Sequence, residues 1–237
     1  MRTDPADDPH FMGVAAVLLG IGALGVVATS VCYALAGPEA ALSGGASSVA
    51  AARAATATAA AWMRAAGLIG MPSDVLLTVG GVMMALSKNG KGAGRAIAGW
   101  LAMAVGGVLF IVVDAMVALV LPPAALGVGA SDAGYPGLRA LFDALFTIGA
   151  WATGAGALAA VWSAHWPELR WPAVRWSMRA AGALGVLATT AHLLGLPGAP
   201  LIGPGIALIA LALLGVALAV YSGSAGNIEN VAALGLR

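Results

Sequence analysis

Residues 95–121 read RAIAGWLAMAVGGVLFIVVDAMVALVL, and this stretch decides the class of fold. After Arg95 it contains a single charged residue, Asp114, and it contains no proline. At a rise of about 1.5 Å per residue, a helix of this length crosses the roughly 30 Å of hydrocarbon in a bilayer. The stretch therefore predicts a transmembrane helix.

The composition extends this prediction to the whole chain. Of the 237 residues, 61% are apolar and only 9% are charged, whereas a soluble chain carries about 25% charged residues. The formal net charge of +1 excludes a nucleic-acid-binding protein that works by neutralising phosphates. The single cysteine, Cys32, lies in an apolar run, which excludes a disulfide framework and a cysteine-based metal motif. No haem or nucleotide motif is recognisable either.

Six apolar segments are long enough to be transmembrane helices. They cover residues 11–35, 66–87, 95–121, 138–164, 175–196 and 200–222. An alanine-rich stretch at 47–64, without glycine or proline, predicts a further helix on the outer side, and residues 223–237 are expected to form a cytoplasmic tail. The prediction is an all-α polytopic membrane protein whose residues 1–237 form a single transmembrane domain.

The distribution of basic residues predicts the orientation. With six spans, one side of the membrane carries eight basic residues: Arg2, Lys88, Lys91, Arg95, Arg170, Arg175, Arg179 and Arg237. The other side carries three: Arg53, Arg64 and Arg139. Because cytoplasmic loops are enriched in lysine and arginine, both termini are expected in the cytoplasm.

Two spans share a short pattern that predicts an internal repeat. Residues 74–80 read DVLLTVG and residues 143–149 read DALFTIG. The spans that follow share Gly-Val-Leu, at 107–109 and 185–187. Spans 2–3 and 4–5 are therefore expected to be two copies of one helical hairpin, related by an axis along the membrane normal.

Four polar residues of these hairpins are predicted to lie at one depth, in the outer third of the membrane: Asp74, Asp114, Asp143 and His192. Ionisable side chains inside a membrane cost free energy and usually mark a function. Thr78, Thr147 and Arg139 lie within one helical turn of these aspartates. The seven residues together predict an ion or proton site, because carboxylates within about 4–6 Å of one another cannot all stay ionised.

Three functions remain open for this site. In the first, the site binds or moves a cation, a proton or a small solute. In the second, its residues are paired polar contacts in a structural or accessory subunit. The third is a membrane-embedded metal or acid–base enzyme, since three carboxylates and an imidazole are metal ligands. No catalytic residue is assigned, and a non-enzymatic role is favoured. The lipid bilayer is the expected partner, with a homo-oligomer or a partner membrane subunit left open.

The C-terminal part of the chain shows a resemblance. From the fourth span onward, it contains Arg170-Trp171-Pro172, Arg175-Trp176, Ala181-Gly182 and Pro200-Leu201-Ile202-Gly203. In this region the chain resembles uncharacterised six-helix inner-membrane proteins of bacteria. The resemblance implies a bacterial inner-membrane protein without an assigned activity, and it implies no functional residue.

Overall fold

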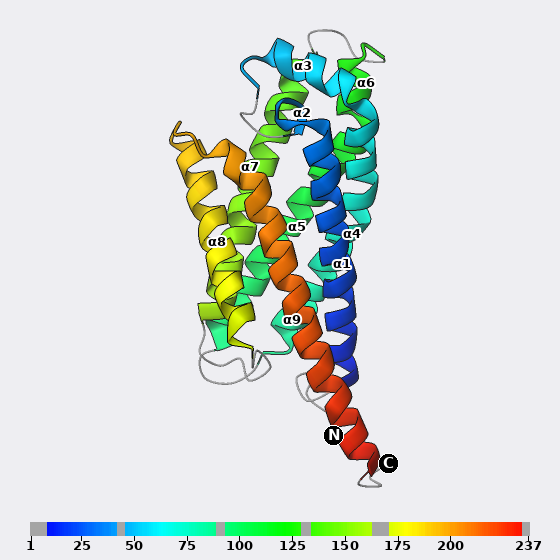
Figure 1. Cartoon of the computed structure of the whole chain (residues 1–237), viewed down its shortest axis with the longest axis vertical. Coiled ribbons are helices and arrows are strands. Elements are labelled where there is room, and N and C mark those ends of the chain that lie inside the picture. The colour runs from blue at the N-terminus through cyan, green and yellow to red at the C-terminus, as the bar shows by residue number, and fades with distance from the viewer. Residues whose placement is uncertain (1–8, 42–45, 89–92, 129–133, 163–170, 234–237) are drawn as a thin grey trace.

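The computed structural model describes residues 9–41, 46–88, 93–128, 134–162 and 171–233, and these residues contain helices and no strand. The helices are α1 (Pro9–Ala36), α2 (Pro38–Ala41), α3 (Val49–Thr58), α4 (Ala60–Leu86), α5 (Ala93–Leu119), α6 (Leu121–Ala125), α7 (Gly134–Trp162), α8 (Pro172–Leu193) and α9 (Ala199–Ala233). The six long helices run side by side, and the short helices α2, α3 and α6 lie at one end of the bundle (Figure 1).

Within the described residues, five helices are long and apolar enough to cross a membrane: α1, α4, α5, α7 and α9. The chain is therefore a helical membrane protein, as its composition predicts. The fifth expected span corresponds to α8, which is shorter and carries Arg175 and Arg179 in its first turns. These charges make α8 less apolar than its neighbours. The described helices thus include five that are long and apolar enough to cross a membrane, where the sequence predicts six.

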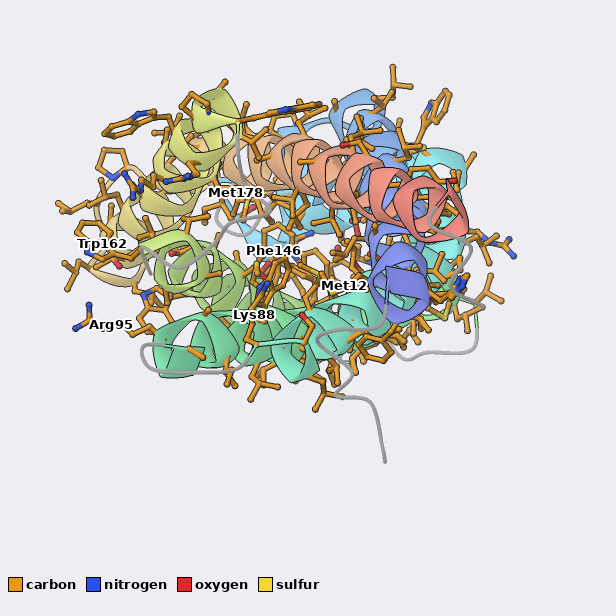
Figure 2. The ribbon with its side chains drawn as sticks, turned by 90° about the horizontal axis from the view of Figure 1, so that it is seen from below. Met12, Lys88, Arg95, Phe146, Trp162 and Met178 are labelled. Atoms are coloured by element: carbon orange, nitrogen blue, oxygen red, sulfur yellow. The ribbon has the colours of Figure 1, made fainter. Side chains whose placement is uncertain are left out.

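The long helices form a closed ring in chain order. Each packs against the next, from α1 through α4, α5, α7 and α8 to α9, and α9 packs back against α1. Seen from below, Phe146 and Met178 lie inside this ring, whereas Trp162 and Arg95 lie at its periphery (Figure 2). Helices α1 and α9 thus complete the ring that the two hairpins α4–α5 and α7–α8 begin.

Small residues allow the helices to approach closely. A Cβ atom placed on Gly156 of α7 would lie 2.6 Å from the carbonyl oxygen of Gly99 on α5, and one on Gly182 of α8 would lie 2.9 Å from the carbonyl oxygen of Gly154. Large aliphatic side chains point outward instead, as Val105 and Leu187 show with exposed fractions of 57% and 68%. Small residues between helices and large apolar ones outside are typical of helices that pack within lipid.

The short helices are tied together over one end of the bundle. Arg53 of α3 donates from Nε to the carbonyl oxygen of Ala125 on α6, at 3.2 Å. The hydroxyl groups of Thr56 on α3 and Tyr135 on α7 form a buried hydrogen bond of 2.9 Å. These contacts hold α3 across the end of the ring, and the alanine-rich stretch 47–64 is accordingly divided between α3 and the beginning of α4.

Several helix boundaries differ from the expected ones. Helix α4 begins at Ala60 and not at residue 66, and α9 continues to Ala233 through most of the expected tail 223–237. Helix α1 ends where Gly37 adopts a φ of +88°, and α8 ends shortly before Gly195, with a φ of +73°. Glycine adopts this left-handed conformation without the steric cost that a Cβ atom brings.

The basic residues of the described chain lie at the two ends of the ring. Lys88, Arg95, Arg175 and Arg179 belong to the end at which α1 begins and α9 finishes, and Arg53, Arg64 and Arg139 to the end covered by α3. Four residues used to predict the orientation lie outside the described residues: Arg2, Lys91, Arg170 and Arg237.

Candidate functional site

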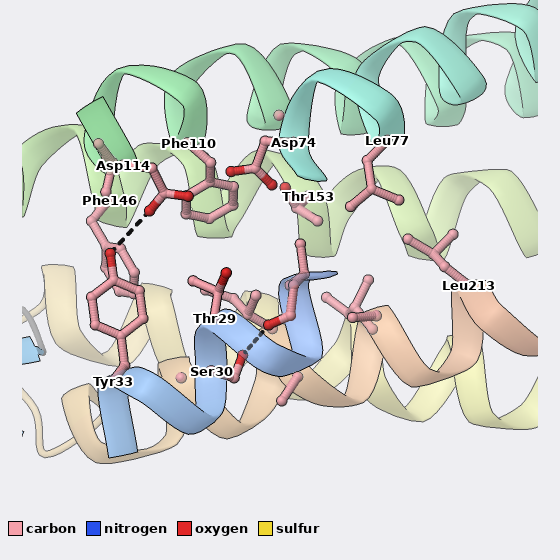
Figure 3. A pocket seen from close by; sticks show the side chains of 18 of the residues that line it. Thr29, Ser30, Tyr33, Asp74, Leu77, Phe110, Asp114, Phe146, Thr153 and Leu213 are labelled. Atoms are coloured by element: carbon pink, nitrogen blue, oxygen red, sulfur yellow. Dashed lines mark hydrogen bonds between the residues drawn. The ribbon is translucent and has the colours of Figure 1, made fainter. Parts of the chain in front are cut away.

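A cavity of about 420 Å³ lies inside the ring, between α1, α4, α5, α7 and α9 (Figure 3). Its volume is within the usual range for sites that bind small molecules. Most of its wall is apolar. The polar side chains of the wall are Thr29, Ser30, Tyr33, Asp74, Asp114 and Thr153. Two of them, Asp74 and Asp114, are ionisable residues that the sequence already singles out.

The carboxyl groups of Asp74 and Asp114 face each other across α4 and α5. Their exposed fractions are 5% and 4%, and Figure 3 shows the two carboxyl groups close to each other. Two ionised carboxylates that are buried next to each other repel, which favours a proton or a cation on the pair. With one proton bound, the pair would carry a single negative charge at the wall of the cavity.

Two residues of other helices determine the position of the Asp114 carboxyl group. Tyr33 of α1 donates a hydrogen bond from its hydroxyl group to Oδ1 of Asp114, at 3.0 Å (Figure 3). Gly70 of α4 leaves the space that the same carboxyl group fills, because a Cβ atom at position 70 would overlap with Oδ2 and Cγ of Asp114. The carboxyl pair is therefore built by three helices.

The hydroxyl groups around the pair differ in their hydrogen bonds. Thr29 donates to the carbonyl oxygen of Ala66, and Ser30 to that of Val26 in its own helix. The Oγ1 atom of Thr153 is buried and has no hydrogen-bond partner among the described residues. Thr153 also lines the cavity, and its Oγ1 atom faces Gly106 of α5.

Asp143 lies in a separate polar group at the same end of the bundle. Its Oδ1 atom accepts a hydrogen bond of 3.1 Å from Nε of Arg139, one helical turn earlier in α7. Arg139 also donates from Nη1 to the carbonyl oxygen of Ala40, at 2.7 Å, and lies over the ring of Phe142. His192 of α8 is close enough to Asp143 for their charges to interact. This arginine–aspartate pair connects α7 to α2.

The structure thus divides the predicted site into two groups. Asp74 and Asp114 line the cavity, whereas Asp143, His192 and Arg139 are not among the described residues of its wall. Each hairpin brings together the polar residues of its own two helices, so the four do not meet at one point. Within the described ranges, no three histidine, cysteine or acidic residues are grouped in a way that would hold a metal ion.

The two threonines of the predicted site do not line the cavity either. Thr147 donates a hydrogen bond of 2.7 Å to the carbonyl oxygen of Asp143 within α7. The Oγ1 atom of Thr78 is buried against Gly107 of α5 and has no hydrogen-bond partner among the described residues. Both hydroxyl groups lie in helix packing, that of Thr147 within α7 and that of Thr78 against α5.

Sequence reasoning missed the contribution of α1. Tyr33 lies two residues before the expected outer end of the first span at residue 35, which is the depth predicted for the aspartates. The depth of Tyr33 in its span is therefore the sequence signal for this contribution, although Tyr33 lies outside the repeat. Thr153 carried no such signal, because its role depends on which face of α7 meets α5.

No family model, no curated protein and no solved structure matches this chain.

Proposed function

We propose that this protein binds a small cationic solute in its central cavity in exchange for a proton, as one step of moving that solute across a bacterial inner membrane. The observation that carries the proposal is the cavity of about 420 Å³ whose wall contains the buried pair Asp74 and Asp114. Buried carboxyl groups inside a membrane are typical of proton and ion pathways.

The architecture that we propose has six transmembrane helices with both termini in the cytoplasm. Helix α8 has 22 residues, which corresponds to about 33 Å at the usual helical rise, and it lies in the ring between α7 and α9. The cluster of basic residues at the end of the ring where α1 begins supports the orientation. The two hairpins α4–α5 and α7–α8 are proposed to be copies of one unit, supported by their shared sequence pattern.

Charge balance supports an exchange of a cation for a proton. A pair of carboxyl groups with one shared proton carries one negative charge, and a second proton or a cation neutralises it. Full ionisation without a cation would place two negative charges next to each other in a medium of low dielectric constant. The pair is therefore suited to hold either a proton or a positively charged group.

Access to the pair is proposed to come from one side at a time. Below the carboxyl groups, the cavity wall is formed by apolar residues such as Leu77, Met103 and Leu213. A charged group does not cross such a wall without polar partners. Release to the opposite side therefore requires the helices to move relative to one another, as in transporters with alternating access.

Infrared spectroscopy of the detergent-purified protein tests the shared proton. The wild-type protein is expected to show the C=O stretching band of a protonated carboxyl group, and Asp74→Asn and Asp114→Asn are each expected to remove or shift it. Asp143→Asn is the matched control, because Asp143 pairs with Arg139 outside the cavity. This control is expected to keep the band unchanged.

Thermal unfolding at several pH values and in the presence of cations completes the test. A ligand that binds only the folded protein raises its stability, so protons or cations that bind at the pair should stabilise the wild-type protein more than Asp114→Asn. The proposal is wrong if the carboxyl band is absent and neither pH nor cations distinguish the two proteins.

A further inference from the structure

We propose that the cavity accepts a hydrophobic organic monocation, a molecule with a single quaternary or protonated amine on an apolar body. This inference rests on the proposed function and names the class of solute. It follows from what the wall of the cavity can and cannot offer to a positive charge.

The wall offers too few oxygen atoms for an inorganic cation. Calcium takes about 6–8 oxygen ligands, and magnesium usually keeps several of its waters. Near the carboxyl pair the polar groups are Tyr33 and Thr153, while Thr29 and Ser30 already donate to backbone carbonyl groups. Water molecules around a metal ion would face an apolar wall and lose hydrogen bonds. An organic cation, by contrast, carries its own apolar surface.

Aromatic rings line the cavity beside the carboxyl pair. Phe110 precedes Asp114 by one helical turn on α5, and its ring meets that of Phe146 edge-on with centroids 5.8 Å apart. Figure 3 shows Phe110 next to the carboxyl groups of Asp74 and Asp114. Trp100 also belongs to the wall. Aromatic faces attract organic cations, most strongly where water is excluded, so rings and carboxyl groups recognise the same part of the solute.

The charge of the site selects a monocation. With one shared proton the carboxyl pair carries one negative charge, which a single ammonium group neutralises. Binding of a second positive charge would require release of the shared proton as well. Without a cation, a second proton neutralises the pair. A monocation displaces this second proton, so that one positive charge faces one negative charge, with the Tyr33 hydroxyl group donating to Asp114. We expect one proton to be released for each cation bound.

Benzyltrimethylammonium is a suitable probe because its charge is permanent, so any proton released must come from the protein. Neopentylbenzene has the same shape with carbon in place of the charged nitrogen, and sodium represents an inorganic cation. Binding is measured by calorimetry on the full chain in detergent micelles. Proton release is measured with a pH-sensitive dye in weakly buffered solution.

The expected result is saturable binding of benzyltrimethylammonium to the wild-type protein with release of one proton, and weaker binding at lower pH. Asp114→Asn and Asp74→Asn are each expected to reduce the affinity at least about 10-fold, as for a charge-assisted contact. Asp143→Asn, the matched control, should bind as the wild type does. Phe110→Leu is expected to weaken binding by about 2- to 5-fold, because the ring contributes roughly 0.5–1 kcal/mol.

The inference is overturned if neopentylbenzene binds as tightly as the cation, or if the cation binds without releasing a proton. These two measurements use the wild-type protein and do not depend on the folding of a variant. If sodium releases the proton and benzyltrimethylammonium does not, the class of solute is wrong while the proposed exchange stands. If neither releases a proton and the infrared band is absent, the proposed function fails together with the inference.

Discussion

The two hairpins α4–α5 and α7–α8 carry the same short pattern and use it differently. In the first, Asp74 faces Asp114 at the wall of a cavity. In the second, Asp143 accepts a hydrogen bond from Arg139 outside the cavity. The aspartates occupy equivalent positions in the two copies of the pattern, so the difference must come from their neighbours.

The residue four positions before each aspartate accounts for the difference. In α4 this residue is Gly70, whose missing side chain leaves room for the carboxyl group of Asp114 from α5. In α7 it is Arg139, whose guanidinium group pairs with Asp143. A glycine thus brings in a second carboxyl group, and an arginine supplies a counter-charge. In our proposal, the first hairpin holds a proton or cation, and the second forms a structural contact.

The largest loss of stability is expected from Arg139→Ala, which removes the ion pair of the second hairpin. The substitution leaves Asp143 and the carbonyl oxygen of Ala40 without their donor. Removing one partner of a buried ion pair costs about 3–5 kcal/mol, and we expect about 3 kcal/mol here because the side chain of Asp143 is 32% exposed. The measurement is thermal unfolding in detergent.

Arg64→Ala is the control, because Arg64 is exposed on α4 at the same end of the bundle. Its effect should stay within about 0.5 kcal/mol. The double variant Arg139→Met with Asp143→Leu should recover most of the lost stability, since apolar residues of similar volume replace such pairs well. Equal effects of Arg139→Ala and Arg64→Ala would contradict the structural role of the pair.

The next effect is expected in the first hairpin, from Gly70→Ala. The added methyl group overlaps with the carboxyl group of Asp114, and overpacking of this kind costs about 1–3 kcal/mol. The substitution should also abolish the protonated carboxyl band by displacing Asp114 from Asp74. In α7, Gly137→Ala adds the same methyl group where nothing lies within 4 Å. This control should leave both stability and the band unchanged or raise stability slightly.

A smaller effect is expected from Tyr33→Phe, which removes the hydrogen bond to Asp114 and should cost about 1 kcal/mol. Tyr135→Phe is the matched variant, since it removes a buried hydrogen bond to Thr56 in the contacts of α3. Both should lower the unfolding temperature by similar amounts. Only Tyr33→Phe should change proton release and cation affinity, and a change in both variants would show that the readout reports on stability alone.

The smallest effects on stability are expected at the two threonines of the shared pattern, and they differ in sign. Thr78→Val removes a buried hydroxyl group without a partner among the described residues, so we expect stability to rise by up to about 1 kcal/mol. Thr147→Val removes a hydrogen bond to the carbonyl oxygen of Asp143, so stability should fall by about 0.5–1 kcal/mol. Changes of the same sign would mean that the two positions have similar surroundings.

Much of the fold was predictable because hydrophobicity is a local property of the chain. The stretch 95–121 needed only its length and its lack of charge to be recognised as a transmembrane helix, and α5 covers Ala93–Leu119. Helix α8 was harder to predict as a span, because Arg175 and Arg179 reduce its apolar character. Its position between α7 and α9 is determined by packing in the ring. Helix α3 was harder still, since contacts of Arg53 and Thr56 with other segments separate it from α4.

For the site, the sequence by itself determined which residues are costly in a membrane and therefore worth explaining: Asp74, Asp114 and Asp143. Their cost depends on residue type and depth, and both can be estimated from the chain alone. Only the tertiary structure decided that Asp74 and Asp114 share a cavity with Tyr33 while Asp143 pairs with Arg139. The physical reason is that hydrogen bonds act over a few ångströms, and the helices that supply the partners are brought within that distance only by packing.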